Sequence, residues 1–138
     1  MRPVEAKQTI TESMLWTIFS KFIRMRDANA HNGLATCFTC GRVMHWSKGD
    51  CGHGIGRQHN ATKYNETNNH FQCKKCNGFE SGQKDIYAMK VDTTYGPGTW
   101  NKLQVASRQV CKRTNNDRVI MYNFYKAEVE RLQKEKNL

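Results

Sequence analysis

No stretch of this sequence is apolar enough to cross a membrane. A membrane-spanning helix needs roughly 20 consecutive apolar residues, and no run approaches that length. Residues 1–8 also lack the apolar core of a secretory signal, and the chain has no internal repeat apart from two similar cysteine pairs. Its 138 residues suffice for one compact domain and not for two of ordinary size. We expect a single cytoplasmic domain over residues 1–138, with no membrane partner.

Acidic residues are scarce. Asp and Glu number 12 against 22 for Lys and Arg, which gives a formal net charge of +10. A surplus of this size attracts polyanions and points to nucleic acid as the partner. A basic surface can also serve solubility alone, but here the basic residues lie among aromatic residues and paired cysteines rather than in a solvated tail. We therefore favour binding to nucleic acid.

Four of the six cysteines form two Cys-x-x-Cys pairs, made by Cys37, Cys40, Cys73 and Cys76. In a reducing cytoplasm such pairs are typical of a tetrahedral zinc site and not of disulfides. Cys51 and Cys111 stand alone, and we expect both to be free thiols. A closed four-thiolate site stabilises a fold but leaves no position for an activated water. Any chemistry must therefore be carried by other residues.

The sequence predicts a first helix over residues 11–26. Thr11 can cap it, and apolar residues recur at three- and four-residue spacing to form one stripe that must be buried, namely Leu15, Ile18, Phe19, Phe22 and Ile23. Lys21, Arg24 and Arg26 share the remaining face. They could contact phosphate, although a solvated helix face is the commoner explanation for such residues.

Between the cysteine pairs the pattern indicates short strands and loops. Residues 42–46 are predicted to form a strand, 47–50 a turn, and 52–56 extended, glycine-rich chain, which together suggest a small hairpin. A polar loop follows over residues 57–69, and the second cysteine pair is expected to open a helix.

Helices are also predicted in the C-terminal half. Residues 83–91 and 99–108 are expected to be helical, with Gly96, Pro97 and Gly98 as a break between them and Thr99 as a cap. The last helix is predicted over residues 116–136, and the apolar residues that suit it for docking are Val119, Ile120, Phe124, Ala127, Val129 and Leu132.

Three polar residues at fixed offsets from the cysteines are candidates for catalysis. His53 could act as a general base, because neutral imidazole can accept a proton from water near neutral pH. Asn68 could hold the loop or orient the imidazole, and Asn77 could offer a carbonyl oxygen to Mg²⁺ or Mn²⁺. Taken singly, each has a plainer explanation as a turn, loop or capping residue. Their combined spacing favours the catalytic interpretation.

From residue 22 through the C-terminal helix, the chain resembles the phage NinG (Rap) recombination endonucleases. The matching segments are 22–27, 37–41, Gly52 and His53 with Arg57 and His59, 61–63, 68–77 and 95–99. The resemblance implies an α+β fold: an HNH (ββα-metal) zinc core over about 34–82, a helical N-terminus over 11–26 and a helical extension over 83–138. It also implies a metal-dependent DNA endonuclease, active on branched recombination intermediates in the bacterial host cell. Resolution of symmetric junctions would favour a homodimer.

The zinc and helix portion is also similar to the phage endonuclease VII enzymes. That likeness assigns the base to His53 and a metal ligand to Asn77. An aspartate directly before the catalytic histidine is the second metal ligand in those enzymes, and Gly52 stands at that position here. Asp50 could bind the ion instead, or His59 or His70 could complete its shell. His59 could alternatively contact DNA.

Four basic residues flank the predicted site and are candidates for phosphate contacts, namely Arg57, Lys63, Lys74 and Lys75. Trp46 and Trp100 could stack on bases at a branch, but burial in the core is the better expectation for each. Two other functions remain open: a non-catalytic zinc module that binds nucleic acid, and a zinc-stabilised protein-interaction domain.

Overall fold

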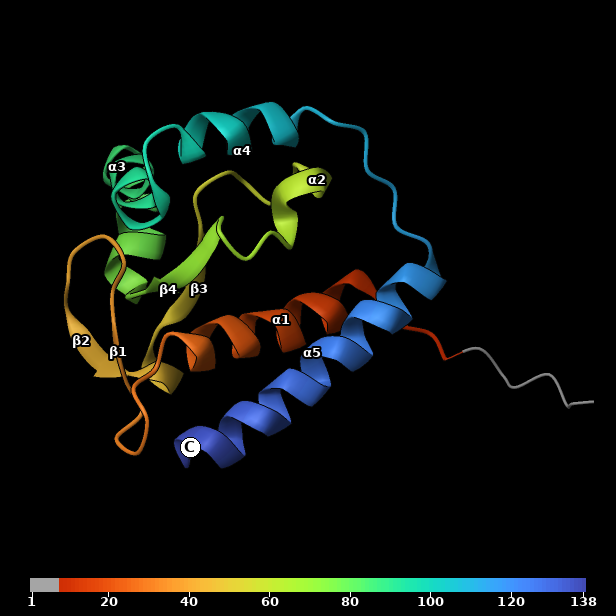
Figure 1. Ribbon diagram of the computed structural model, residues 1–138, viewed down its shortest axis with the longest axis horizontal. Helices are drawn as coiled ribbons and strands as arrows, with labels where there is room; N and C mark the ends of the chain where they lie inside the picture. The colour runs from red at the N-terminus through yellow and green to blue at the C-terminus, as the bar shows by residue number, and fades with distance from the viewer. Residues whose placement is uncertain (1–7) are drawn as a thin grey trace, which may run out of the picture.

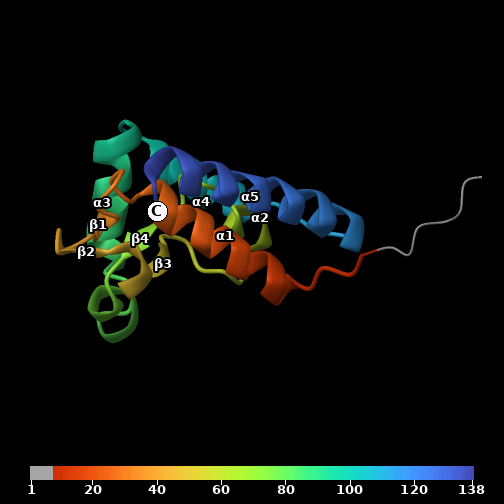
Figure 2. The same ribbon diagram turned by 90° about the horizontal axis from the view of Figure 1, so that it is seen from below.

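The computed structural model describes residues 8–138 and has helices on both sides of a small antiparallel hairpin (Figure 1). Helices α1 (Glu12–Arg26) and α5 (Asn115–Lys136) lie along one side of it, and α3 (Lys84–Tyr95) and α4 (Thr99–Ser107) along the other. Figure 2 shows that the strands gather at one end of the α1–α5 pair. The fold is α+β, as predicted, and within residues 8–138 no helix is long and apolar enough to span a membrane.

Helix α1 begins and packs as its sequence predicts. The Thr11 hydroxyl accepts a hydrogen bond from the Met14 amide, so the first turn is capped. The apolar stripe is turned into the main core, where Leu15, Phe19 and Ile23 have no exposed surface. This core is completed by Tyr64 and by residues of α5.

Helix α5 runs beside α1 in the same direction. At one end, Asn115 Oδ1 accepts a hydrogen bond from the Ile10 amide at 2.9 Å. At the other end, Lys136 Nζ donates to the main-chain oxygens of Met25, Arg26 and Ala28 at 2.7–3.0 Å. The lysine thus joins the last turn of α5 to the C-terminal end of α1 and the residues that follow it.

The face of α5 that docks differs from the predicted one. Tyr125, Val129 and Leu132 are buried against α1, whereas Ile120 and Phe124 are 62% and 53% exposed and Ala127 is also exposed. The prediction was wrong for these last three residues. The physical reason is that a single neighbouring helix covers a single face of α5, and the apolar residues of α5 are spread over more than one face.

The four strands form two separate hairpins. β1 (Leu34–Thr36) pairs with β2 (Val43–His45), and β3 (Asp50–His53) pairs with β4 (Asn69–Gln72). The single hairpin predicted over 42–56 is therefore wrong. A 3₁₀ turn (Trp46–Lys48) separates β2 from β3, and these two strands do not pair with each other. β2 pairs with the preceding strand β1, and β3 pairs with β4.

The remaining helices form a second, smaller core. Ile55, Tyr87, Val91 and Leu103 pack together where α3 and α4 cover the loop after β3. The short helix α2 (Asn60–Lys63) interrupts the predicted polar loop, and α3 extends four residues beyond its predicted end. Thr99 is the first residue of α4 and not its cap, because Gly98 precedes it in a left-handed conformation.

Candidate active site and metal centre

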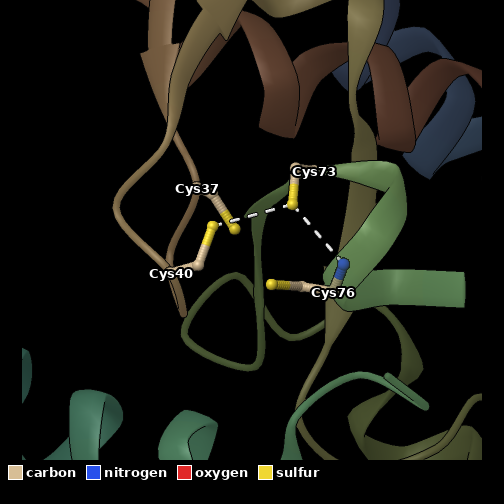
Figure 3. A group of neighbouring side chains, drawn as sticks. All are labelled: Cys37, Cys40, Cys73 and Cys76. Carbon is tan, nitrogen blue, oxygen red and sulfur yellow. Dashed lines mark hydrogen bonds between the residues drawn. The ribbon is translucent and has the colours of Figure 1, made fainter. Parts of the chain in front are cut away.

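The two cysteine pairs converge on one point. Cys37 and Cys40 come from the connection between β1 and β2, and Cys73 and Cys76 from the segment after β4 (Figure 3). The four sulfurs lie within 4.8 Å of one another, and the Cys40 and Cys73 sulfurs are 3.7 Å apart. A tetrahedral zinc with bonds of about 2.3 Å needs sulfurs roughly 3.8 Å apart. The cluster could therefore hold a zinc ion.

Without a metal ion, the protein environment favours ionisation of one cysteine of the cluster, Cys37. Although burial opposes ionisation, hydrogen bonds from the Thr39 hydroxyl and from main-chain amides lower the pKa of Cys37 to about 6. Burial, together with the neighbouring thiols of Cys73 and Cys40, raises the pKa of Cys76 to about 12. A divalent cation would stabilise all four thiolates, so metal binding should release protons.

Asn77 directly follows the last cysteine, in a π-helical turn (η2, Lys75–Phe79). Such turns often occur at functional sites. Asn77 Nδ2 donates a hydrogen bond to Asp50 Oδ2 at 3.0 Å, so the carboxamide meets the carboxylate at the start of β3. The cysteine cluster thus holds Asn77 beside Asp50, and these two polar side chains lie next to the cluster.

His53, Asp50 and Asn77 line one cavity of about 390 Å³. Asp50 and His53 come from the two ends of β3, and Asn77 from the turn after β4. The wall opposite them is formed by α1, through Trp16, Ser20 and Arg24. The sequence predicted α1 as a helix that precedes the zinc core and suggested only that its basic face, with Arg24, could contact phosphate. Spacing by four residues puts Trp16, Ser20 and Arg24 on one helix face.

The His53 imidazole is half-buried and packs edge-on against the Trp16 indole, with the ring centroids 6.3 Å apart. Its Nδ1 atom is buried and has no hydrogen-bond partner in the part of the chain that the structure describes. Burial and the positive charges of Lys84 and Arg57 lower the pKa of His53 to about 4. The ring is therefore neutral at physiological pH, the form that can accept a proton.

Among residues 8–138, Asp50 is the only residue with a carboxylate that lines this cavity. Besides the Asn77 amide, it accepts a hydrogen bond from Lys74 Nζ at 2.7 Å. A carboxylate and a side-chain amide are oxygen donors of the kind that Mg²⁺ and Mn²⁺ prefer. Asp50 and Asn77 thus have the donor chemistry for such an ion, whereas the Asn77 nitrogen faces Asp50 Oδ2 and Lys74 is a competing positive charge at Asp50 Oδ1.

Position 52 cannot supply the carboxylate. A Cβ atom added to Gly52 would collide with Gln72 Oε1 on the paired strand. Gln72 is fully buried, and its amide donates to Thr39 Oγ1 and to the Gly82 carbonyl, each at 3.0 Å, so it cannot readily move aside. A glycine at position 52 therefore leaves the space that Gln72 occupies, and Gln72 links the β3–β4 pair to Thr39 of the first cysteine pair.

Asn68 holds the loop between β3 and β4. It is fully buried; its Oδ1 accepts from the Ile55 amide, and its Nδ2 donates to the carbonyls of Ile55 and Thr62. It makes no hydrogen bond to His53. Of the two roles predicted for Asn68, the structure shows the loop-holding one.

The other predicted ligands lie away from the cavity. His59 is exposed before α2. His70 is buried beside a separate pocket, where it stacks on Phe38 with centroids 3.9 Å apart and contacts Tyr95. Neither histidine lines the cavity with Asp50. Lys75 lies instead beside Cys40 and Cys76.

The remaining basic candidates differ in their partners. Arg57 and Lys74 line the cavity, whereas Lys63 forms an ion pair with Glu12 at 3.0 Å. Arg26 is a structural residue, because it donates to Asp27 and to the carbonyls of Glu66 and Asn69. Trp46 and Trp100 are both partly buried and pack on the two cores, as expected.

Comparison with known proteins gives one match. The family model described as Bacteriophage Lambda NinG protein matches residues 5–135. No curated protein and no solved structure matches significantly. Since the family match spans nearly the whole chain, including both cysteine pairs and the cavity, the chain belongs to the bacteriophage lambda NinG protein family.

Proposed function

We propose that this protein is a metal-dependent endonuclease of the HNH type that hydrolyses phosphodiester bonds in DNA. The observation that carries the proposal is the convergence of a neutral imidazole, a carboxylate and a carboxamide in one basic cavity. Hydrolysis of a phosphodiester needs a base for the attacking water and a positive charge near the leaving oxygen. His53 supplies the first, and a cation held by Asp50 and Asn77 would supply the second.

His53 would take the proton from the attacking water. A base with a pKa of about 4 is neutral but weak. A bound phosphate would bring negative charge beside Arg57 and Lys84, whose charges help to lower that pKa, and would thereby make the imidazole more basic. Substrate binding thus strengthens the base at the site where it is needed.

The zinc cluster would have a structural role. A site closed by four cysteines leaves no position for water or substrate. Its contribution to catalysis is to fix Asn77, which follows Cys76 directly, against Asp50 on β3. A divalent cation at Asp50 and Asn77 would act as a Lewis acid on the scissile phosphate.

Resemblance to the NinG recombination endonucleases favours branched DNA as the substrate. No residue of the cavity distinguishes a branch from a linear duplex, so this part rests on the family alone. A comparison of linear duplex, flap, D-loop and four-way junction substrates in Mg²⁺ and Mn²⁺ tests it. The proposal expects the branched substrates to be cut faster than the linear duplex at equal enzyme concentration.

Replacement of the base separates an enzyme from a non-catalytic zinc module that binds nucleic acid. We expect His53→Ala to lower the cleavage rate by about 10²–10⁴-fold, the usual contribution of a general base, while the Kd for DNA stays within a few-fold. His59→Ala is the matched control, because that exposed imidazole lies outside the cavity. Unchanged cleavage by His53→Ala would refute the assignment, and binding without cleavage by the wild type would favour the non-catalytic module.

A further inference from the structure

Two arginines at the rim of the cavity are each stacked on a tryptophan. The Arg24 guanidinium lies 5.3 Å from the centre of the Trp46 ring, and the Arg57 guanidinium lies 4.7 Å from the centre of the Trp16 ring. Both arginines line the cavity that holds His53 and Asp50. Such stacking orients a guanidinium and leaves the N–H groups at its edge free to donate.

Neither guanidinium is neutralised. Within residues 8–138, neither arginine forms an ion pair with a carboxylate. Arg24 is half-buried, and its one hydrogen bond runs from Nε to the Ser20 carbonyl of its own helix. Burial lowers the pKa of Arg24 although the nearby carboxylate of Asp50 acts in the opposite direction, so the charge of Arg24 lacks full compensation from the protein. An anion from outside would provide that compensation.

The two arginines are held at opposite ends of one helix face. Trp16, which carries Arg57, and Arg24 are eight residues apart on α1, or about 12 Å along the helix. Ser20 lies between them, and His53 packs against Trp16. A ligand that reaches both ends of this face therefore passes over the catalytic residues, as a nucleic-acid backbone with its repeated phosphates can.

We propose that Arg24 and Arg57, braced by Trp46 and Trp16, clamp two phosphates of the cut DNA strand along α1, one on each side of the scissile bond. The inference rests on the proposed nuclease function and makes α1 part of the substrate-binding site. Arginine suits this role because its planar guanidinium can grip a phosphate with two parallel hydrogen bonds. The tryptophans limit the rotamers of the arginines, so less side-chain freedom is lost on binding.

Salt dependence of DNA binding tests the clamp without any cleavage. Affinity for a labelled four-way junction is measured from 50 to about 200 mM salt, in zinc-loaded protein without Mg²⁺ or Mn²⁺. Each phosphate contact contributes about 0.9 to the slope of log K against log salt. We expect Arg24→Gln and Arg57→Gln each to reduce the slope by about 0.9, and the double variant by about 1.8.

Three further variants separate the effect of the arginine charge from the effect of stacking on tryptophan. Lys21→Gln removes the same charge from another face of α1, outside the cavity, and should leave the slope nearly unchanged. Trp46→Leu keeps both arginines and should weaken binding several-fold without changing the slope. Zinc content and thermal melting show whether each variant is folded, and Arg24→Lys, which keeps the charge, should restore the slope but not the full affinity.

The clamp is overturned if Arg24→Gln and Lys21→Gln change the slope equally, or if the wild type does not bind DNA. Failure of the proposed nuclease gives a different pattern. If the protein binds DNA with the predicted slopes but never cuts it, the phosphate clamp is supported and the nuclease function is refuted. If the protein cuts DNA but the arginine variants keep the wild-type slope, the nuclease function is supported and the phosphate clamp is refuted.

Discussion

The surroundings of Gly52 show why the proposed metal-binding carboxylate is at position 50 and not at position 52. In the β3–β4 pair Gln72 lies opposite Asp50, and its buried side chain extends over Gly52. The amide of Gln72 also connects this pair to Thr39 of the first cysteine pair. Strand β3 presents Asp50 to the cavity, two residues before Gly52. The carboxylate of Asp50 thus lies at the end of β3 that is nearer Asn77, while the Gln72 side chain fills the space over Gly52.

Substitution of Gly52 tests this packing. We expect Gly52→Ala to lower the free energy of unfolding by about 1–3 kcal/mol, the usual cost of overpacking. Urea denaturation measures the change. Gly78→Ala is the control, because a Cβ atom there meets open space. Adding Gln72→Ala to Gly52→Ala should remove most of the penalty relative to Gln72→Ala alone; equal penalties in both backgrounds would exclude the predicted collision.

The pH dependence of cleavage tests the state of His53. The pKa of its imidazole is lowered to about 4. The neutral base is therefore present above pH 4 and is lost as the pH falls through that value. We expect the acidic limb of kcat/KM, which reports the free enzyme, to have a midpoint near 4, and that of kcat to lie higher because the bound phosphate offsets the charges of Arg57 and Lys84. A kcat/KM midpoint at or above 6.5 would contradict this environment.

At the scale of elements, the α1–α5 pair supports the wall of the cavity. Lys136 donates to three carbonyl groups around the end of α1, close to Arg24 in sequence. α5 also carries a complete capping box at Thr114 and Asp117. The C-terminal helix thus anchors both ends of α1, since Asn115 binds Ile10 at the opposite end.

Removal of the Lys136 ammonium should weaken this anchor. We expect Lys136→Met to lower the free energy of unfolding by about 1.5–3 kcal/mol, the range for hydrogen bonds that involve a charged group. Lys134→Met is the matched control, because it removes an exposed lysine from the same last turn. Chemical denaturation of both variants provides the measurement, and equal losses would show that the contact with α1 contributes nothing.

The elements also show what local sequence can and cannot predict. The cap and apolar stripe of α1 are local signals, and they predicted both its start and its buried face. The pairing of β3 with β4 is not local, because it depends on the loop that Asn68 closes. The docking face of α5 is set by its neighbour, so Tyr125 is buried while Phe124 is exposed.

The candidate site was predictable where it stays close to the cysteines in sequence. His53 and Asn77 were singled out by their offsets from the two pairs, Asp50 was one of several alternatives suggested by the likeness to endonuclease VII, and the fold brings the three into one cavity. Trp16 was not predicted at the site and Arg24 was predicted only as a possible phosphate contact, because only tertiary packing brings α1 to the cavity. His59 and His70 have suitable chemistry but lie elsewhere.

For the molecule as a whole, zinc should be the link that holds the two hairpins together. We expect one zinc per chain and, on chelation, a large fall in thermal stability with loss of any cleavage activity. Cys73→Ser should lose the metal, whereas Cys111→Ser should keep it, because Cys111 lies outside the cluster. Metal analysis and thermal melting measure both effects, and full zinc retention by Cys73→Ser would contradict the four-cysteine site.

The most direct test of the account is the cation dependence of DNA cleavage by zinc-loaded protein. A labelled four-way junction is incubated under single-turnover conditions without a second metal, and then with Mg²⁺ or Mn²⁺. The account predicts cleavage only after the second ion is added, and a loss of at least about 100-fold in Asp50→Ala and Asn77→Ala at unchanged zinc content. Cleavage that needs no second ion, or that persists in both variants, would contradict it.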